Sequence, residues 1–429
     1  MPNRHKVLNP LRAAKLDVRK PQGRRFQLFA RIKRQFDSAL RSAQFYIESK
    51  KVSDTELPPF EPNAISQVFV KRGTVGADDG FLRLVSLMGE NGLSFYKTQE
   101  INGLIAPNDI VILKINSQWN KRGGTNTDLL RSVAKAVASH PSRFNGEIVV
   151  ADNGQAQMGS YGAGGSLSWK RPNSLYKNQS ALDVIKELQK TVLISGVLWD
   201  EYTADRVSDY DRGNLNDGFV LEDKLLPSGI QISYPKFKTE FGTKISFKKG
   251  VWNQDRKQFD SSRLKIINMP VLKTHVLYQA TGAIKSYMGT TSCALTSQRS
   301  HYSVPRGGMG AQMALTRMPV LNVMDMIWIG AYSGPGVSYT AAIEKNMVAA
   351  SIDPVALDYW CVKHVLMPEA LKASKGSNGL ETKRALLDPD QAIPGSFGRW
   401  LRLSALEIQK AGIPVALGDG NIDVVSSGL

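Results

Sequence analysis

Cysteine is scarce in this chain, which has only Cys293 and Cys361 among its 429 residues. Two thiols are too few for a four-cysteine zinc or iron–sulfur site built from this chain alone, and too few for a disulfide framework. We therefore expect no iron–sulfur cluster from this chain. Free thiols are typical of a reducing compartment, so we expect a cytoplasmic protein.

Long apolar runs are also missing. No stretch approaches the roughly 20 apolar residues that cross a bilayer, so we expect no transmembrane segment. The paired arginines of GRRFQLFARIKRQF (23–36) look like the start of an export signal. Charged residues, however, stand where about 7–15 apolar residues should follow, so we expect no export. The apolar content of 42% and charged content of 22% are those of a globular protein.

The positive charge is concentrated at one end of the chain. The net charge is +17, and residues 1–51 hold 14 of the 55 Lys and Arg residues but three of the 38 acidic ones. Phe26, Phe29 and Phe36 recur at helical spacing, which favours an amphipathic helix. This basic arm could contact RNA, lipid headgroups or a protein partner, or it could pack on the rest of the chain.

Apolar strands alternate with helices after the arm. DIVILKIN (109–116) and GEIVVADNG (146–154) have the pattern of buried strands, and LLRSVAKAVASH (129–140) is an amphipathic helix that Thr125 or Thr127 could cap. Strand, helix and strand in this order predict a parallel sheet. A further strand is expected over 263–272. The segment 158–262, with a helix expected at SALDVIKELQKTVL (180–193), is read as an elaboration of the same domain.

A second αβ region begins near residue 318. It contains the strand-like segments 318–330 and 346–352, then a helix capped by Asp353 with Pro354 in its first turn. We therefore predict an α/β protein with two lobes and a basic N-terminal arm. The predicted parts are 1–61 for the arm and linker, 62–305 for the larger α/β domain, and 306–429 for the smaller one.

Chemistry-bearing residues follow several of these strands. Ligands of parallel sheets bind beyond the carboxyl ends of the strands. Lys114 and Asn116 lie at the end of one strand, and Asp152 lies at the end of the next. The strand expected to end near Leu272 delivers Lys273 and His275 to the same edge.

The run KTHVLYQATGAIKSYMG (273–289) holds Lys273, His275 and Lys285 among small and apolar residues. Small residues such as Thr281 and Gly282 let a ligand approach the backbone. A histidine can move a proton or bind a metal, and a lysine can hold an anion or react as an amine. The plainer alternative is a helix start with solvated lysines and one capped histidine.

Other candidates have simpler explanations. Asp325, Asp353 and Asp358 could together bind a cation, although helix capping already explains Asp353. His140 precedes a proline at a helix end, which is typical of a surface residue. His364 lies within an apolar helix and is read as a core or surface residue.

Four segments resemble the prokaryotic family known as domain of unknown function number 362. In that family a strand and a proline lead to Lys-x-His, then to Thr-Gly-Ala-x-Lys-Asn and a glycine. The other matching segments are DIVILKIN, VLNVMDMIWIGAYSGPG and MVAASIDPVALDYWCVKHVL, and all four lie in the family's order within about residues 66–366. Ser286 replaces the usual asparagine after Lys285.

A more distant resemblance is to the nickel-pincer lactate racemases. Their catalytic histidine is followed ten residues later by the lysine that carries a pincer nucleotide, and sixteen residues after that lysine comes a histidine that binds nickel. His275, Lys285 and His301 have this spacing. The resemblance implies that His275 is the acid or base, that Lys285 anchors the cofactor and that His301 binds metal. Asp325, from the aspartate group above, is a further candidate metal ligand.

The racemases also have a second catalytic histidine after the strand that corresponds to EIVVADNG, and this chain has none there. We therefore predict an enzyme whose site is related to that of the racemases. Its reaction is left open, and the alternatives are epimerisation, one-sided redox chemistry and binding without a reaction. Lys114, Lys273 and Lys285 would hold a small anionic substrate or a nucleotide-like cofactor, and His275 would transfer a proton. The alternative is a protein that binds nucleic acid or an anionic surface through residues 1–51.

Overall fold

The computed structural model describes residues 57–154, 164–170, 174–175, 178–297, 299–332, 334–374 and 379–427. The chain divides into two compact units, Met1–Ile47 and Glu48–Leu429. The basic arm and its predicted helix lie outside the described residues. The described residues all belong to the second unit.

A central sheet of ten strands organises the described part of this unit. Eight strands follow one another in the order β17-β1-β16-β15-β12-β4-β5-β6, and β13 and β14 pair beside β15. Their bounds are Ser66–Arg72 (β1), Ile110–Lys114 (β4), Glu147–Asp152 (β5), Ile194–Leu198 (β6), Leu264–Asn268 (β12), Val271–His275 (β13), Gln279–Thr281 (β14), Leu321–Gly330 (β15), Ile343–Ser351 (β16) and Ile422–Ser427 (β17).

Most neighbours in this sheet are parallel, as the alternation of strands and helices predicted. The pairs β15–β12, β12–β4, β4–β5 and β5–β6 are parallel, whereas β16 runs antiparallel to β15 and β1. The carboxyl ends of β4, β5, β6 and β12 therefore meet at one edge.

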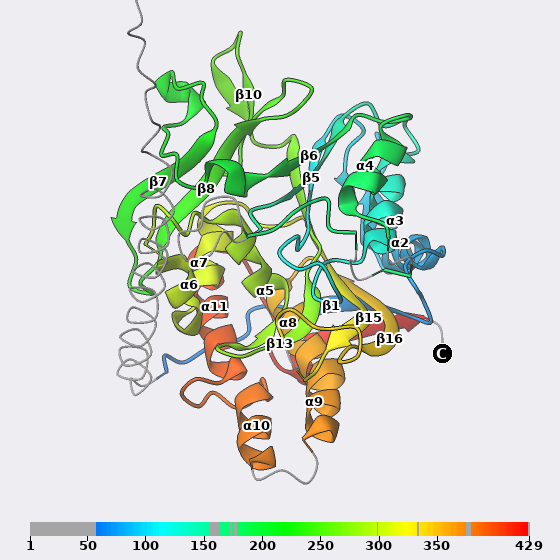
Figure 1. The fold of residues 1–429 in the computed structure, drawn as a ribbon, viewed down its shortest axis with the longest axis vertical. Helices are drawn as coiled ribbons and strands as arrows, with labels where there is room; N and C mark the ends of the chain where they lie inside the picture. The colour runs from blue at the N-terminus through cyan, green and yellow to red at the C-terminus, as the bar shows by residue number, and fades with distance from the viewer. Residues whose placement is uncertain are drawn as a thin grey trace, which may run out of the picture. The chain divides into compact units, whose positions relative to one another are not determined.

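Helices cover both faces of the sheet (Figure 1). On one face lie α2 (Gly80–Glu90), α3 (Thr127–Ala138) and α4 (Ala181–Leu188), and on the other lie α5 (Ala283–Ser286), α7 (Gly308–Leu315), α8 (Pro354–Cys361) and α11 (Phe397–Lys410). Successive β4 residues alternate between two apolar clusters, with Ile112 in the cluster under α8 and Leu113 in the cluster under α3. This alternation follows from the period of two along a strand.

The remaining described elements complete the unit. The short helices α6 (Arg299–Tyr302), α9 (Met367–Ala373) and α10 (Leu380–Leu387) lie on the side of α7 and α8, and β2 (Ser94–Tyr96) pairs with β3 (Gly103–Ile105). A second sheet of five strands has the order β11-β10-β9-β8-β7. Its strands are Gly218–Leu225 (β7), Gln231–Lys238 (β8), Lys244–Ser246 (β9), Gly250–Asn253 (β10) and Gln258–Asp260 (β11).

The predicted boundary between residues 305 and 306 does not separate two sheets. β15 and β16 follow this boundary, yet β15 pairs with β12 and β16 pairs with β1, which both precede it. Backbone hydrogen bonds therefore join the two predicted lobes in one sheet. The second sheet, which the sequence did not reveal, lies in the segment that was expected only to elaborate the first domain.

Local details differ from the predictions at three places. Asn126, and neither Thr125 nor Thr127, caps α3, because its side chain accepts the backbone N–H groups of Asp128 and Leu129. The strand predicted over 263–272 is two strands, β12 and β13, separated at Met269 and Pro270. Proline has no N–H to donate to a sheet. Lys273 and His275 thus lie inside β13 instead of beyond a strand end.

The capping residues predicted for α8 are confirmed. Asp353 accepts the backbone N–H groups of Val355 and Ala356, and Pro354 begins the helix. The helix continues through a π-helical turn, Val362–Leu366, into α9. Among the described residues, no helix is long and apolar enough to cross a membrane.

Candidate site at the carboxyl edge of the central sheet

Lys114 ends β4 at the edge where the parallel strands terminate. It pairs in register with Asn268 of β12 on one side and Ala151 of β5 on the other. Its side chain is 1% exposed, and its Nζ lies 3.2 Å from Asp152 Oδ1. The adjacent strand ends predicted for Lys114 and Asp152 are therefore confirmed, and the two charges form a buried ion pair.

Two further hydrogen bonds hold the Lys114 ammonium. It donates to the carbonyl oxygen of Ile115 and to Ser286 Oγ, both at 2.9 Å. Ser286 belongs to α5, so the position at which this chain departs from the family pattern contacts a site lysine directly. Burial lowers the pKa of Lys114, and Asp152 opposes that shift.

Lys273 is equally buried in β13 and has a different set of contacts. Its Nζ donates to the carbonyl oxygen of Gly123 in the loop after β4, and lies 6.0 Å from the centre of the Trp119 ring. Burial, followed by the positive charges of Lys285 and Lys114, lowers its pKa well below the usual value. The loop after β4 and the strand β13 thus meet at Lys273.

Lys285 is positioned by α5, whose start is tightly packed. Asp358 of α8 accepts the backbone N–H groups of Ala283 and Ile284, at 2.5 and 3.0 Å. A Cβ atom on Gly282 would lie 2.1 Å from Asp358 Oδ1, so this position has no room for a side chain. The protein's own carboxylate therefore occupies the helix start, which leaves Gly282 a packing role in place of the predicted contact with a cofactor.

The Lys285 amine itself is available. Among the described residues its Nζ has no hydrogen-bond or ion-pair partner, although it lies 5.4 Å from the centre of the Tyr278 ring. Burial, followed by repulsion from Lys114, lowers the pKa of Lys285 to about 8. A lysine with this pKa is mostly charged at neutral pH but keeps a reactive neutral fraction.

Both predicted histidines lie against the same tyrosine. The His275 ring stacks on Tyr278 with ring centres 5.0 Å apart, and the His301 ring meets it edge-on at 5.1 Å. The two histidine rings are 6.3 Å apart. The ring of Tyr278 therefore lies next to His275, Lys285 and His301, which are spaced ten and sixteen residues apart in the sequence.

Burial keeps both imidazoles neutral. It lowers the pKa of His275, and the charges of Lys285, His301 and Lys273 act in the same direction. Burial and Lys285 lower the pKa of His301 to about 3. Both rings keep some solvent exposure, since each is only half-buried by surface area.

The remaining predicted ligand-binding residues have mixed environments. Asn116 Oδ1 and Thr281 Oγ1 are buried and lack hydrogen-bond partners within the described structure, which leaves both free for a ligand. Asp325, by contrast, accepts the backbone N–H groups of Asn126 and Ile327. These bonds explain its burial without a metal.

The metal predictions receive no support from geometry. No group of three or more His, Cys, Asp or Glu side chains that could hold a metal occurs in the described ranges. Asp353 and Asp358 each cap a helix. The three aspartates that were candidates for a shared cation site, Asp325, Asp353 and Asp358, therefore each accept backbone N–H groups in a different part of the fold. His140, expected at the surface, is buried, and its Nε2 lies 3.1 Å from the carbonyl oxygens of Lys97 and Ile105.

Sequence reasoning missed the role of Tyr278. Its hydroxyl donates to the carbonyl oxygen of His301 at 2.8 Å and lies 3.0 Å from His301 Nδ1. The signal was present, because Tyr278 falls between His275 and Lys285 in the motif itself. A tyrosine in an apolar run reads as a core residue unless the fold is known.

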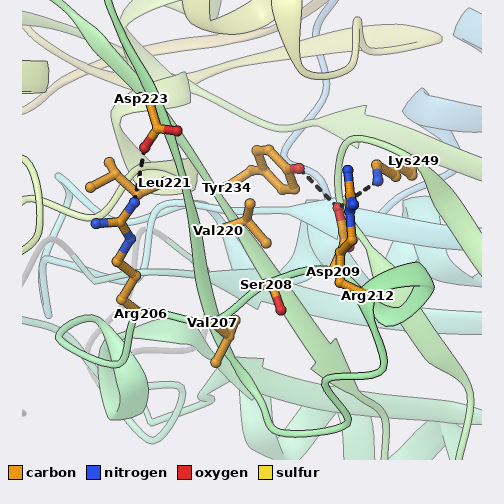
Figure 2. Close-up of a pocket in the computed structure, with 10 residues that line it drawn as sticks. All are labelled: Arg206, Val207, Ser208, Asp209, Arg212, Val220, Leu221, Asp223, Tyr234 and Lys249. Atoms are coloured by element: carbon orange, nitrogen blue, oxygen red, sulfur yellow. Dashed lines mark hydrogen bonds and ion pairs between the residues drawn. The ribbon is translucent and has the colours of Figure 1, made fainter.

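A separate open hollow of about 460 Å³ lies against the second sheet (Figure 2). Most of its charges are paired, since Arg206 pairs with Asp223, and Lys249 pairs with Asp209 and Asp211, whereas Arg212 has no ion pair within the described residues. None of the predicted site residues lines it. Because its remaining cation, Arg212, is not buried, it is a weaker candidate site than the buried amine at Lys285.

Comparison with known families bears on the strand and motif region. Residues 263–363 match the family model described as Domain of unknown function (DUF362). The chain resembles that family. The matched region runs from the start of β12 to the turn after α8 and includes Lys273, His275, Lys285 and His301, whereas Lys114 and Asp152 lie outside it.

No curated protein and no solved structure matches the chain. The resemblance to nickel-pincer racemases has no counterpart in these comparisons and stays a prediction.

Proposed function

We propose that this chain is an enzyme that binds a small anionic substrate or a nucleotide-like cofactor at the lysine and histidine cluster. Lys273, Lys285, His275 and His301 form this cluster together with Lys114. The observation that carries the proposal is the buried Lys285 amine, which has no partner among the described residues. Proton transfer is the chemistry that the neighbouring histidines favour.

Electrostatics supports an anionic ligand. Lys114 and Lys285 both depress the pKa of Lys273, and Lys114 depresses that of Lys285. Asp152 pairs closely with Lys114 alone. Burying like charges is costly, and an anion near Lys285 would offset both the repulsion and the lost hydration.

A covalently held cofactor is a narrower form of this proposal. Lys285 Nζ is free to form a bond, and His301 is a neutral imidazole that could serve as one metal ligand. Because the described residues include no three-ligand group, a metal at His301 would take its other ligands from outside these residues, and a cofactor could supply them. A pincer-type group would be able to accept a hydride, and Lys285 and His301 would be the residues that hold it.

The alternative, binding of nucleic acid or an anionic surface by residues 1–51, depends on charge alone. No contact of the described residues favours it, so we keep it as a second outcome of experiment. A cytoplasmic location likewise stays a proposal, supported by the two free and buried cysteines.

Lysine labelling tests the proposed site. We expect pyridoxal phosphate, which combines an aldehyde with an anionic group, to form an imine at Lys285 that borohydride fixes for peptide mapping. Labelling should increase as the pH rises toward 8, because the neutral amine is the nucleophile. Inorganic phosphate should protect Lys285.

The Lys285→Met variant should lose this label, and Lys224→Met is the control because Lys224 is exposed and has no predicted role. Labelling that follows surface exposure, with Lys285 untouched and phosphate without effect, would contradict the proposal. Mass analysis of protein from its own host adds a second readout, since a covalent adduct on Lys285 would support the cofactor form.

A further inference from the structure

The two histidines of the cluster have opposite hydrogen-bonding roles. His275 Nδ1 accepts the backbone N–H of Leu277 at 3.1 Å. A nitrogen that accepts an N–H has no hydrogen of its own, so neutral His275 carries its hydrogen on Nε2. Nε2 has no partner among the described residues, and His275 therefore offers a free N–H donor.

His301 has the other tautomer because of Tyr278. The Tyr278 hydroxyl has one hydrogen, and the carbonyl oxygen of His301, 2.8 Å away, can only accept it. Because the two contacts share one hydroxyl hydrogen, we assign it to the carbonyl oxygen and place a hydrogen on His301 Nδ1, which then donates to Tyr278 Oη across 3.0 Å. His301 Nε2 is left with a free lone pair, unpartnered in the part of the chain that the structure describes.

The cluster thus presents a donor, an acceptor and an ammonium group around one tyrosine ring. His275 and His301 lie 5.0 and 5.1 Å from the Tyr278 ring centre, and Lys285 Nζ lies 5.4 Å from it. A ligand that satisfies all three carries an anionic group, an acceptor oxygen and a hydrogen that faces the His301 lone pair. A small carboxylate with a neighbouring carbonyl has these three features.

We propose that His301 Nε2 removes the proton next to the carbonyl of a small 2-oxo acid, while His275 Nε2–H stabilises the oxygen of the resulting enolate. Lys285 holds the carboxylate, so the inference rests on the proposed function and names its substrate class. Tyr278 is the positioning residue that keeps the His301 lone pair available.

The step balances without any further reactant. The C–H bond breaks and its proton goes to His301 Nε2. The electron pair becomes the carbon–carbon double bond of the enolate, and the carbonyl oxygen gains the negative charge that His275 N–H then stabilises. Return of the proton from His301 regenerates the 2-oxo acid, and no electron is gained or lost.

This assignment revises the role that the sequence suggested for His275. Acting as a base through Nδ1 would break its bond to Leu277, and Nε2 already carries the hydrogen. His301 is a weak base in the free protein because burial and Lys285 lower its pKa to about 3. A bound carboxylate that neutralises Lys285 removes one of these two causes, which couples substrate binding to the strength of the base.

Hydrogen exchange of pyruvate tests the step. Wild-type protein in D₂O should exchange the methyl hydrogens of pyruvate faster than buffer does, followed by proton NMR. His301→Gln should slow the exchange at least ~100-fold, and His275→Gln should slow it ~10-fold or more. His364→Gln is the control, because His364 is exposed, pairs with Asp419 and contacts none of the cluster side chains through a ring, hydrogen-bond or ion-pair interaction within the described residues.

Calorimetric titration with pyruvate and with inorganic phosphate separates the two proposals. Binding without exchange, or exchange that His301→Gln leaves unchanged, overturns the inference but leaves the anion site intact. Absence of both binding and Lys285 labelling overturns both.

Nitrogen NMR of the histidines gives a readout independent of activity. We expect the hydrogen on Nε2 of His275 and on Nδ1 of His301 in the neutral protein. Tyr278→Phe should remove the Nδ1 preference of His301 and lower the exchange rate, while phosphate binding is retained. The same tautomer at both histidines in the wild type would overturn the inference.

Discussion

The Lys285 charge, at the scale of single residues, should destabilise the folded protein at neutral pH. Its pKa falls from the usual 10.5 to about 8 on folding. Between these values the unfolded chain binds a proton that the folded protein does not, so the free energy of unfolding should rise with pH across this window. Below pH 8 both states are protonated, and the penalty is fully present.

Removing that charge should therefore stabilise the protein. We expect Lys285→Met to increase the free energy of unfolding at pH 7 by up to ~3 kcal/mol, and to have a smaller effect at pH 10. Urea unfolding at both pH values measures this difference, with Lys224→Met as the exposed control. If Lys285→Met instead lowers the free energy of unfolding by the same amount at pH 7 and pH 10, burial of the Lys285 charge does not destabilise the folded protein.

Breaking the Lys114–Asp152 pair should lower the free energy of unfolding. Asp152→Asn leaves the Lys114 ammonium buried without its carboxylate, and loss of one partner of such a pair typically costs ~3–5 kcal/mol. The double variant with Lys114→Met should recover part of that loss. Denaturant melts of the single and double variants give the coupling, and equal losses in both would mean that the hydrogen bonds from Ser117 to Asp152 dominate.

The start of α5 is the sensitive point at the scale of elements. In Gly282→Ala, a Cβ atom would overlap Asp358 Oδ1, and overpacking of this kind typically costs ~1–3 kcal/mol. Because α5 positions Lys285, we also expect weaker phosphate protection in the labelling experiment. Thermal unfolding measures the first effect and labelling the second.

Gly89→Ala is the matched control for that substitution. Gly89 lies inside α2, and a Cβ atom added there would meet nothing within 4 Å, so alanine should be neutral or stabilising by ~0.5–1 kcal/mol. Equal effects of the two substitutions would contradict the packing role of Gly282.

At the scale of the whole molecule, the shared sheet predicts joint unfolding. β15 pairs with β12 across the position where two lobes were expected, and β16 pairs with β1. A chain of residues 48–429 should therefore unfold in one calorimetric transition, since neither part keeps its sheet without the other. Two separate transitions, with proteolysis of the intermediate near residue 305, would restore the two-lobe description.

Much of the fold was predictable because local signals were strong. The apolar runs at β4 and β5, the helix between them, and the Asp353–Pro354 helix start all follow from period, capping and composition. The split of β12 and β13 was not predicted, although Pro270 marks it. The second sheet escaped because β9, β10 and β11 have only three or four residues each, and because charged or polar residues interrupt the two longer strands, β7 and β8.

The sequence by itself determined the α/β class, the position of Lys114 and Asp152 at the carboxyl ends of adjacent strands, and the spacing of His275, Lys285 and His301. Only the tertiary structure decided which atoms are free there. Asp358 fills the start of α5, Tyr278 Oη lies 3.0 Å from His301 Nδ1, and Asp152 pairs with Lys114 and leaves Lys285 alone. Spacing along the chain places residues on an edge, but hydrogen bonds and burial between distant segments set the charge and the available nitrogen of each.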